Sequence, residues 1–159
     1  MRIAITTLVA PPRRTGVGNY LANLLRALQR IDQSNEYFVF VGSDSRRLFP
    51  LAAPNFRAIP ICLRHDPRWL MRPLYHAWQN SLAGVYLKRL GVDVFHVPNL
   101  LPVVFPFVPT VVTVHDLAEY QLVKYSLLRQ WYRRTALLLS ARRASRIIAV
   151  SQATKTDLI

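Results

Sequence analysis

The most constraining feature of this sequence is an alternation of two hydrophobic patterns along the chain. Six short runs of apolar and β-branched residues, five to eight residues each, have the composition of strands that are buried on both faces. They occupy residues 2–9, 37–41, 56–61, 93–97, 110–114 and 146–150. Segments with helical spacing separate several of them, so the sequence predicts an α/β fold with a Rossmann-like, doubly wound parallel sheet.

In the sequence, the first predicted helix precedes the second strand and the second predicted helix follows the third strand. Residues 17–31 repeat apolar side chains at helical spacing. Residues 69–90 do the same, with a kink expected near Pro73 and an end at Gly91. Pro60 removes a backbone donor from the third strand, which places that strand at an edge of the sheet.

The last two predicted helices flank the sixth strand. Residues 125–143 place Trp131 and Tyr132 on the apolar face of a helix, which predicts that both rings are in the core. Another helix is expected after the sixth strand, where Thr154 and Asp157 have the spacing of a capping box. The whole chain is expected to form one domain, residues 1–159, that ends early in this helix.

Charge and cysteine content limit the classes of partner. The formal net charge of +13 predicts an anionic partner: a phosphorylated substrate, an anionic membrane or nucleic acid. The single cysteine, Cys62, cannot form an internal disulfide, and no metal-ligand spacing is present, so no metal site is expected. The apolar run after Arg2 is too short for most secretory signals, so a cytoplasmic location is expected, at the membrane surface if an anionic membrane is the partner.

One apolar stretch has the length of a membrane span. Residues 94–114 contain no Asp, Glu, Lys or Arg, but four prolines interrupt them. Because each proline removes a backbone donor, two buried strands joined by a loop are expected there.

Glycine and polar residues follow several predicted strands. Ligands of open α/β sheets bind beyond the carboxyl ends of the strands, so these residues are expected to converge on one rim. They are Gly16, Gly18 and Asn19 after the first strand, His96 and Asn99 at the fourth, His115 and Asp116 after the fifth, and Ser151 after the sixth.

These residues allow both functional and structural interpretations. Gly16 and Gly18 would let a phosphate approach the backbone at a helix N-terminus, or they form a tight turn. Leu21 occupies the third glycine position of a dinucleotide fingerprint, which disfavours an oxidoreductase. His115 could hydrogen-bond a sugar or phosphate or act as a base, or its ring is satisfied by backbone. Asp116 could contact substrate or cap the segment that follows it.

A basic segment is the remaining candidate for binding. Residues 124–146 contain seven Lys or Arg and no Asp or Glu. On the predicted helix, Arg129, Arg133 and Arg134 point away from the apolar face. Such a helix can lie against anionic lipid or nucleic acid, or it presents a solvated face.

With these residues in place, the chain resembles glycosyltransferase family 4 and its relatives, the retaining GT-B enzymes. The segments that carry the resemblance are TGVGNY at 15–20, DVFHVP at 93–98, VTVHDL at 112–117 and ASRIIAVSQATKTDL at 144–158. They occur in the order of the family and extend along essentially the whole chain. The resemblance implies two Rossmann-like domains facing across a cleft, with this chain as the N-terminal, acceptor-side half.

The resemblance also implies an activity and roles for individual residues. It implies transfer of a sugar, of the hexosyltransferase type, from a nucleotide-sugar donor to a glycan or lipid-linked acceptor, generally without a metal or other cofactor. Gly16 and Gly18 match the loop near the donor phosphates, and Ser151 matches a serine at the rim. His115 matches the histidine that reaches the donor sugar. The expected acceptor-side residues are Asn19, His96, Asn99 and Asp116.

The departure from the family concerns the second domain. The basic residues and glutamates that bind the diphosphate in the family belong to a C-terminal donor domain, which residues 1–159 do not include. Preorganised charge of this kind is usually the largest catalytic contribution, so the chain alone is expected to be inactive. The alternative is a non-catalytic, basic Rossmann-like module that binds an anionic membrane or, with weaker support, nucleic acid.

Overall fold

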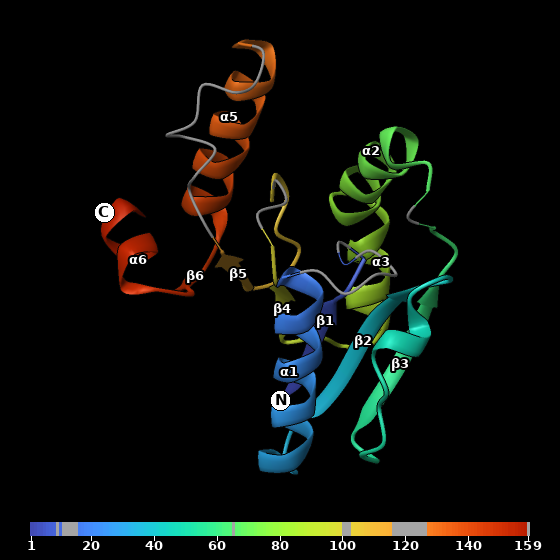
Figure 1. Cartoon of the computed structure of the whole chain (residues 1–159). Helices are drawn as coiled ribbons and strands as arrows, with labels where there is room; N and C mark the ends of the chain where they lie inside the picture. Colours follow the sequence, from blue (N-terminus) through green and yellow to red (C-terminus); the bar gives the residue numbers. More distant parts are fainter. Residues whose placement is uncertain (9, 11–15, 65, 100–102, 116–126, 159) are drawn as a thin grey trace.

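A parallel sheet of six strands forms the centre of the molecule (Figure 1). The computed structural model describes residues 1–8, 10, 16–64, 66–99, 103–115 and 127–158. The strands are β1 (Arg2–Thr6), β2 (Glu36–Gly42), β3 (Phe56–Ile61), β4 (Val94–Val97), β5 (Thr110–Val114) and β6 (Arg146–Ala149). All five neighbouring pairs are parallel, in the order β3-β2-β1-β4-β5-β6. The predicted doubly wound α/β sheet is confirmed, and the strand order reverses between β1 and β4, where such folds bind ligands.

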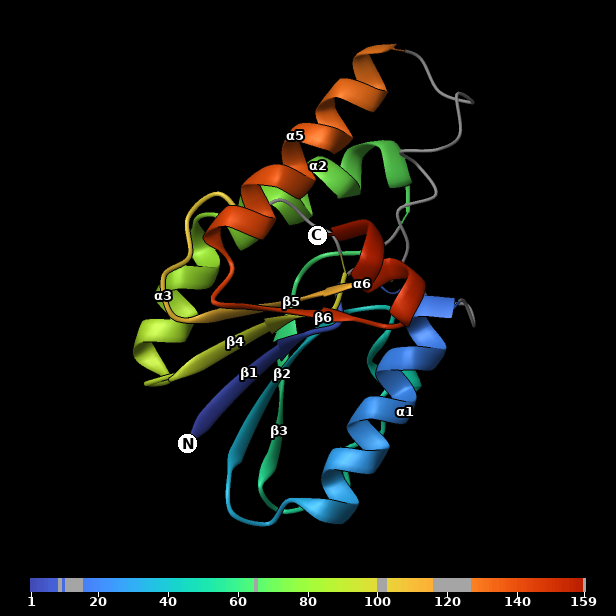
Figure 2. The ribbon, with the colours of Figure 1, turned by 90° about the vertical axis from the view of Figure 1, so that its left-hand side faces the viewer.

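The sheet has a core on each face. On one face, α1 (Gly16–Ile31) packs its buried Leu21 and Leu25 against the β1–β3 half of the sheet. On the other face lie α2 (Arg68–Gln79), α3 (Leu82–Arg89) and α5 (Leu127–Arg143), as Figure 2 shows. Only the short helix α6 (Gln152–Leu158) and the 3-10 helix η1 (Arg46–Leu48) complete the described helices. Strands buried by helices on both sides need the near-continuous apolar runs seen in the sequence.

The connection from β4 to β5 contains no described helix. It is an irregular proline-rich segment whose described residues are 98–99 and 103–109. The predicted pair of buried strands is therefore confirmed by β4 and β5, and the described residues between them, 98–99 and 103–109, are not helical. In the described part of the chain, no helix is long and apolar enough to cross a membrane.

The helical segment 69–90 breaks at a different place from the one predicted. Pro73 lies inside α2 without ending it, and the chain leaves the helix at Asn80 and Ser81 before α3 begins. Pro73 is in the second turn of α2, where it removes the one helical hydrogen bond that an N–H at this position would donate to the carbonyl four residues earlier. The Asn80 Oδ1 atom instead accepts hydrogen bonds from the backbone N–H groups of Val104 and Phe105, at 2.7 and 3.3 Å.

The structure confirms the predictions for Gly91 and Pro60. Gly91 follows α3 with a φ of 61°, a left-handed conformation that favours glycine. Pro60 lies in β3, which is an edge strand.

The prediction of which face of the helix at 125–143 is buried was wrong. Trp131 is 67% exposed and Leu138 is 54% exposed, whereas Leu137 and Ser140 are buried. The Ser140 hydroxyl oxygen accepts a hydrogen bond from the backbone N–H of Val103 at 3.0 Å. A polar residue is therefore on the buried side, because it serves the proline-rich segment, and hydrophobic spacing alone could not show that. The side chain of Tyr132 lies outside the described residues.

Candidate functional site

Four elements meet at the carboxyl ends of the central strands. They are the start of α1, the ends of β4 and β5, and the start of α6 (Figure 2). A chain of contacts joins them, from Tyr20 on α1 through Thr113 and His115 to Thr154 on α6. Segments that are far apart in the sequence thus converge on one rim, as the strand-end positions predicted.

His115 is held by contacts on three sides. Its Nε2 atom lies 2.9 Å from the carbonyl oxygen of Pro98, and its ring meets the Tyr20 ring edge-on with centroids 4.9 Å apart. Its backbone carbonyl accepts a hydrogen bond from the Thr154 hydroxyl at 3.4 Å. A carbonyl oxygen can only accept, so Nε2 carries the proton and, in the neutral ring, Nδ1 presents a lone pair. These contacts fix the orientation of the half-buried ring.

His96 is in a different environment. Its Nε2 atom lies 2.8 Å from the Thr113 hydroxyl, and the same hydroxyl is 3.3 Å from the hydroxyl of Tyr20. Burial lowers the pKa of His96 to about 4, because the low-dielectric interior disfavours the charged ring. His96 is therefore neutral near pH 7 and shares a buried hydrogen-bond group with Thr113. This geometry fits support of the rim better than direct contact with an acceptor.

The two glycines begin α1. Gly16 is the first residue of the helix and is exposed, while Gly18 is buried. A Cβ atom built on Gly16 meets none of the described atoms within 4 Å, and its φ is not positive. The fold itself therefore does not require glycine at this position, which leaves approach of a ligand to the helix N-terminus as a reason for it. Asn19 is exposed on the same first turn.

Ser151 caps the N-terminus of α6, a role that the sequence analysis gave to Thr154 and Asp157. Its Oγ accepts the backbone N–H of Thr154 at 3.1 Å and lies 3.0 Å from the Thr154 hydroxyl. Ser151 is thus the N-cap of α6, and the capping box expected between Thr154 and Asp157 was wrong. Capping needs the residue just before the helix, and Thr154 is already three residues beyond it.

The remaining predicted residues are placed unevenly. Asn99 is half-buried beside Pro98, at the end of β4. Asp116 and the side chains of Arg129 and Arg133 lie outside the described residues. Arg134 is exposed on α5. Within the described ranges, no group of three or more His, Cys, Asp and Glu side chains could hold a metal ion.

Four contact residues of this rim were not predicted. Tyr20, Pro98, Thr113 and Thr154 position His115 and His96, but each depends on the register of strands or the start of a helix. The only sequence signal is that Thr113 and His115 are two residues apart, so that both side chains lie on the α1 side of β5.

Comparison with known families gives a direct result. The model of the family described as Glycosyltransferase Family 4 matches residues 14–159. A search among curated proteins finds no match.

Proposed function

The chain belongs to glycosyltransferase family 4, and on this basis we propose that it is the acceptor-side, N-terminal domain of a retaining hexosyltransferase. The reaction moves a sugar from a nucleotide-sugar donor to a glycan or lipid-linked acceptor. The observation that supports this most strongly is the fixed orientation of His115 at the rim where α1, β4, β5 and α6 meet.

The chemistry proposed for His115 follows from its tautomer. With Nε2–H donated to the Pro98 carbonyl, the neutral ring offers Nδ1 as an acceptor for a hydroxyl group of the donor sugar. A sugar hydroxyl becomes a stronger hydrogen-bond donor as positive charge develops on the sugar ring during departure of the diphosphate. The contact therefore strengthens in the transition state, which is the condition for lowering the barrier.

The α1 N-terminus is proposed to bind the donor phosphates. Gly16 leaves space for a phosphate at the first turn, where the positive end of the helix dipole favours an anion. No acidic residue lies in that first turn to oppose the binding. Ser151 borders the same rim, but its Oγ already caps α6.

The test of this proposal is substitution of His115 in a complete enzyme. Residues 1–159 are joined to a family C-terminal domain, and His115→Ala is expected to lower turnover by about 10²–10³. The midpoint of thermal unfolding should fall only slightly, because the half-buried ring makes one hydrogen bond, to the Pro98 carbonyl, and one edge contact, with Tyr20.

The matched control is His76→Ala. His76 lies on α2, a helix that contributes nothing to the rim, so turnover per folded molecule should stay close to that of the parent. If His115→Ala lowers only the unfolding temperature, the histidine is structural and its proposed contact with the donor sugar is wrong.

A further inference from the structure

The outer side of α3 is apolar although it faces solvent. Ala83 and Leu87 are buried against the sheet, and Leu82 and Val85 are exposed. Tyr86, four residues after Leu82, packs its ring edge-on against Phe40 with centroids 6.0 Å apart and is exposed over the rest of its side chain. The exposed fractions of Leu82, Val85 and Tyr86 are 57%, 46% and 38%. A helix on the surface of a globular protein normally has polar residues at these positions.

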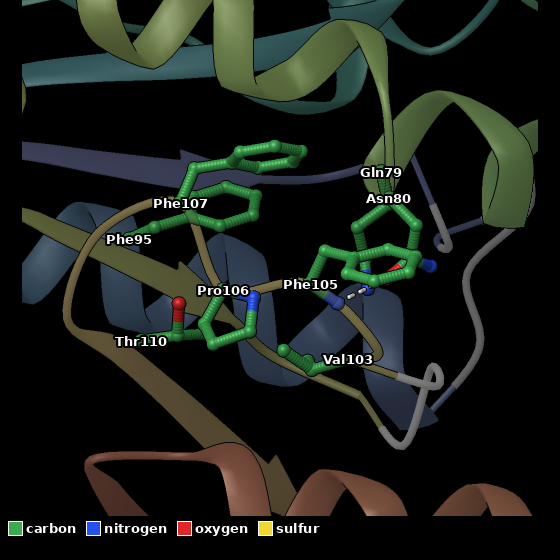
Figure 3. Close-up of a pocket in the computed structure, with 8 residues that line it drawn as sticks. All are labelled: Gln79, Asn80, Phe95, Val103, Phe105, Pro106, Phe107 and Thr110. Carbon is green, nitrogen blue, oxygen red and sulfur yellow. Dashed lines mark hydrogen bonds between the residues drawn. The ribbon is translucent and has the colours of Figure 1, made fainter.

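The proline-rich segment before β5 extends this apolar surface. Phe105 and Phe107 are 58% and 47% exposed. The Phe107 ring lies so close to α3 that a Cβ atom on Gly84 would come within 2.6 Å of it. Figure 3 shows Phe105 beside Asn80 and Phe107 beside Phe95. We call the surface made by these five apolar residues the apolar platform: Leu82, Val85, Tyr86, Phe105 and Phe107.

The segment with the two phenylalanines is fixed in place. Asn80 accepts the backbone N–H groups of Val104 and Phe105, and Ser140 accepts that of Val103. The Arg143 guanidinium donates to the Val104 carbonyl at 2.9 Å. The exposure of the rings is thus a property of a hydrogen-bonded segment that is held between α3 and α5.

Basic residues border the apolar platform. Lys88 and Arg89 end α3, and Arg142 and Arg143 end α5 beside the proline-rich segment; all four are exposed. Residues 67–92 and 94–115 contain no Asp or Glu, and the carboxylate of Asp93 accepts the backbone N–H of Arg2 at 2.7 Å. A large apolar area with a cationic border complements a surface that is negatively charged outside and apolar beneath.

We propose that the apolar platform docks the protein on an anionic lipid bilayer. Phe105 and Leu82, the two most exposed side chains of the platform, enter the acyl boundary. Lys88, Arg89 and Arg142 contact lipid phosphates, and each adds electrostatic attraction within a Debye length of the surface. Aliphatic side chains have no role in binding a phosphate backbone, which favours a bilayer over nucleic acid.

The position of the platform leaves the rim accessible. α3 and the segment before β5 lie at the amino ends of the strands, whereas His115 lies at the carboxyl ends (Figure 2). Docking therefore does not cover the proposed catalytic site, and it does not depend on the transferase proposal. The docking contact is centred on α3, while the sequence placed it on Arg129, Arg133 and Arg134 of α5.

The first test measures insertion at a single position. Cys62 is the only cysteine and is exposed, so Cys62→Ser allows one new cysteine to be labelled with an environment-sensitive nitrobenzoxadiazole dye. Phe105→Cys is the test position. Ile31→Cys, on a residue that is 77% exposed at the end of α1 on the opposite face of the sheet, is the control. With vesicles of 30% phosphatidylglycerol in phosphatidylcholine, a composition chosen as about that of an anionic membrane, the dye at 105 should brighten and shift to the blue while the dye at 31 stays unchanged.

The second test measures affinity by vesicle cosedimentation. Leu82→Gln with Phe105→Ser should weaken binding about tenfold or more, since each substitution removes a large apolar side chain from the inserted surface. Ile31→Gln should leave it unchanged. Lys88→Gln with Arg142→Gln should weaken binding more than Arg26→Gln with Arg30→Gln on α1, and added salt should weaken it further. Retained thermal unfolding shows that each variant folds.

Several results would overturn the proposal. An unchanged dye signal at 105, or equal signals at 105 and 31, shows that the platform does not insert, whether or not the double variant folds. Equal binding to pure phosphatidylcholine removes the role of anionic lipid. Tighter binding to random duplex DNA, unaffected by Leu82→Gln with Phe105→Ser, assigns the positive charge to nucleic acid.

Discussion

Two histidines on one side of the sheet differ in what their surroundings allow. His96 is buried and shares the Thr113 hydroxyl with Tyr20, whereas His115 is half-buried and fixed by the Pro98 carbonyl. Their sequence positions, each at or just after a strand end, are alike. Only the packing around each ring separates a supporting histidine from a histidine that can meet a ligand.

The burial of His96 predicts a pH dependence of stability. Its pKa is lowered in the folded state from its ordinary 6.5 to about 4, so the unfolded chain binds more protons between these values. Stability from this group is complete above about pH 6.5 and is lost as the pH falls towards 4, by roughly 3 kcal/mol in total. Urea unfolding of the chain at pH 7.5 and at pH 5.0, values on either side of about 6.5, should show the loss.

The control for this prediction is His96→Asn. Asparagine keeps a hydrogen-bonding group for Thr113 but does not titrate, so the difference in unfolding free energy between the two pH values should shrink. The other histidines contribute equally to both proteins. Parallel pH profiles of parent and variant would mean that His96 is not buried as the structure shows.

Part of the candidate site could be predicted from residue identity and position. His115, His96 and Gly16 follow strands in the sequence, and the contacts of Tyr20, Thr113 and Thr154 join these positions at one rim. The contacts themselves depend on strand register, such as the pairing of His96 with Val111, which sets which side chain of β5 comes within reach. Register is a property of the whole sheet and leaves no local sequence signal.

At the scale of elements, the strands were more predictable than the helices. Strands β2, β4 and β5 are largely buried on both faces, so their apolar composition does not depend on which neighbour covers them. The orientation of α5 depends on one polar contact, from Ser140 to Val103, and the break after α2 depends on another, from Asn80 to Val104. Hydrophobic period cannot predict such contacts, because they join segments more than twenty residues apart.

Asn80 therefore provides a test at the scale of elements. Asn80→Ala leaves the backbone N–H groups of Val104 and Phe105 without an acceptor, and stability should fall by roughly 1–3 kcal/mol. Asn80→Asp retains an acceptor for both and should cost less, although it loses the bond from Nδ2 to the His76 carbonyl. Chemical denaturation measures both variants. Equal losses would show that the side-chain donor, and not the anchoring of the proline-rich segment, is the stabilising part.

At the scale of the whole molecule, the two faces of the sheet are covered unequally. α1 covers the β1–β3 half of one face, and the same face of β6 presents Ile148 and Val150, at 42% and 44% exposure. The register pairs Ile148 with Thr113, so this apolar surface continues directly from the rim that holds His115. Contiguous exposed apolar area of this kind typically marks a surface that meets another protein body.

The charge at the rim leads to a prediction about donor binding by residues 1–159 alone. A nucleotide-sugar diphosphate carries negative charge, but the described rim residues include no Lys or Arg, and the α1 N-terminus supplies a partial charge of only about +0.5. Such a helix end stabilises a bound anion by roughly 0.3–1 kcal/mol when exposed, far less than micromolar binding requires. Calorimetric titration with UDP-, GDP- and ADP-sugars should therefore show no saturable heat at about 100 μM ligand, and no transferase activity should be detected.

The control is the same titration after residues 1–159 are joined to a family C-terminal domain, which should restore binding because groups across the cleft neutralise the diphosphate. A micromolar complex with residues 1–159 alone would contradict this division of labour, since it would require the α1 end and its neighbours to bind the donor unaided.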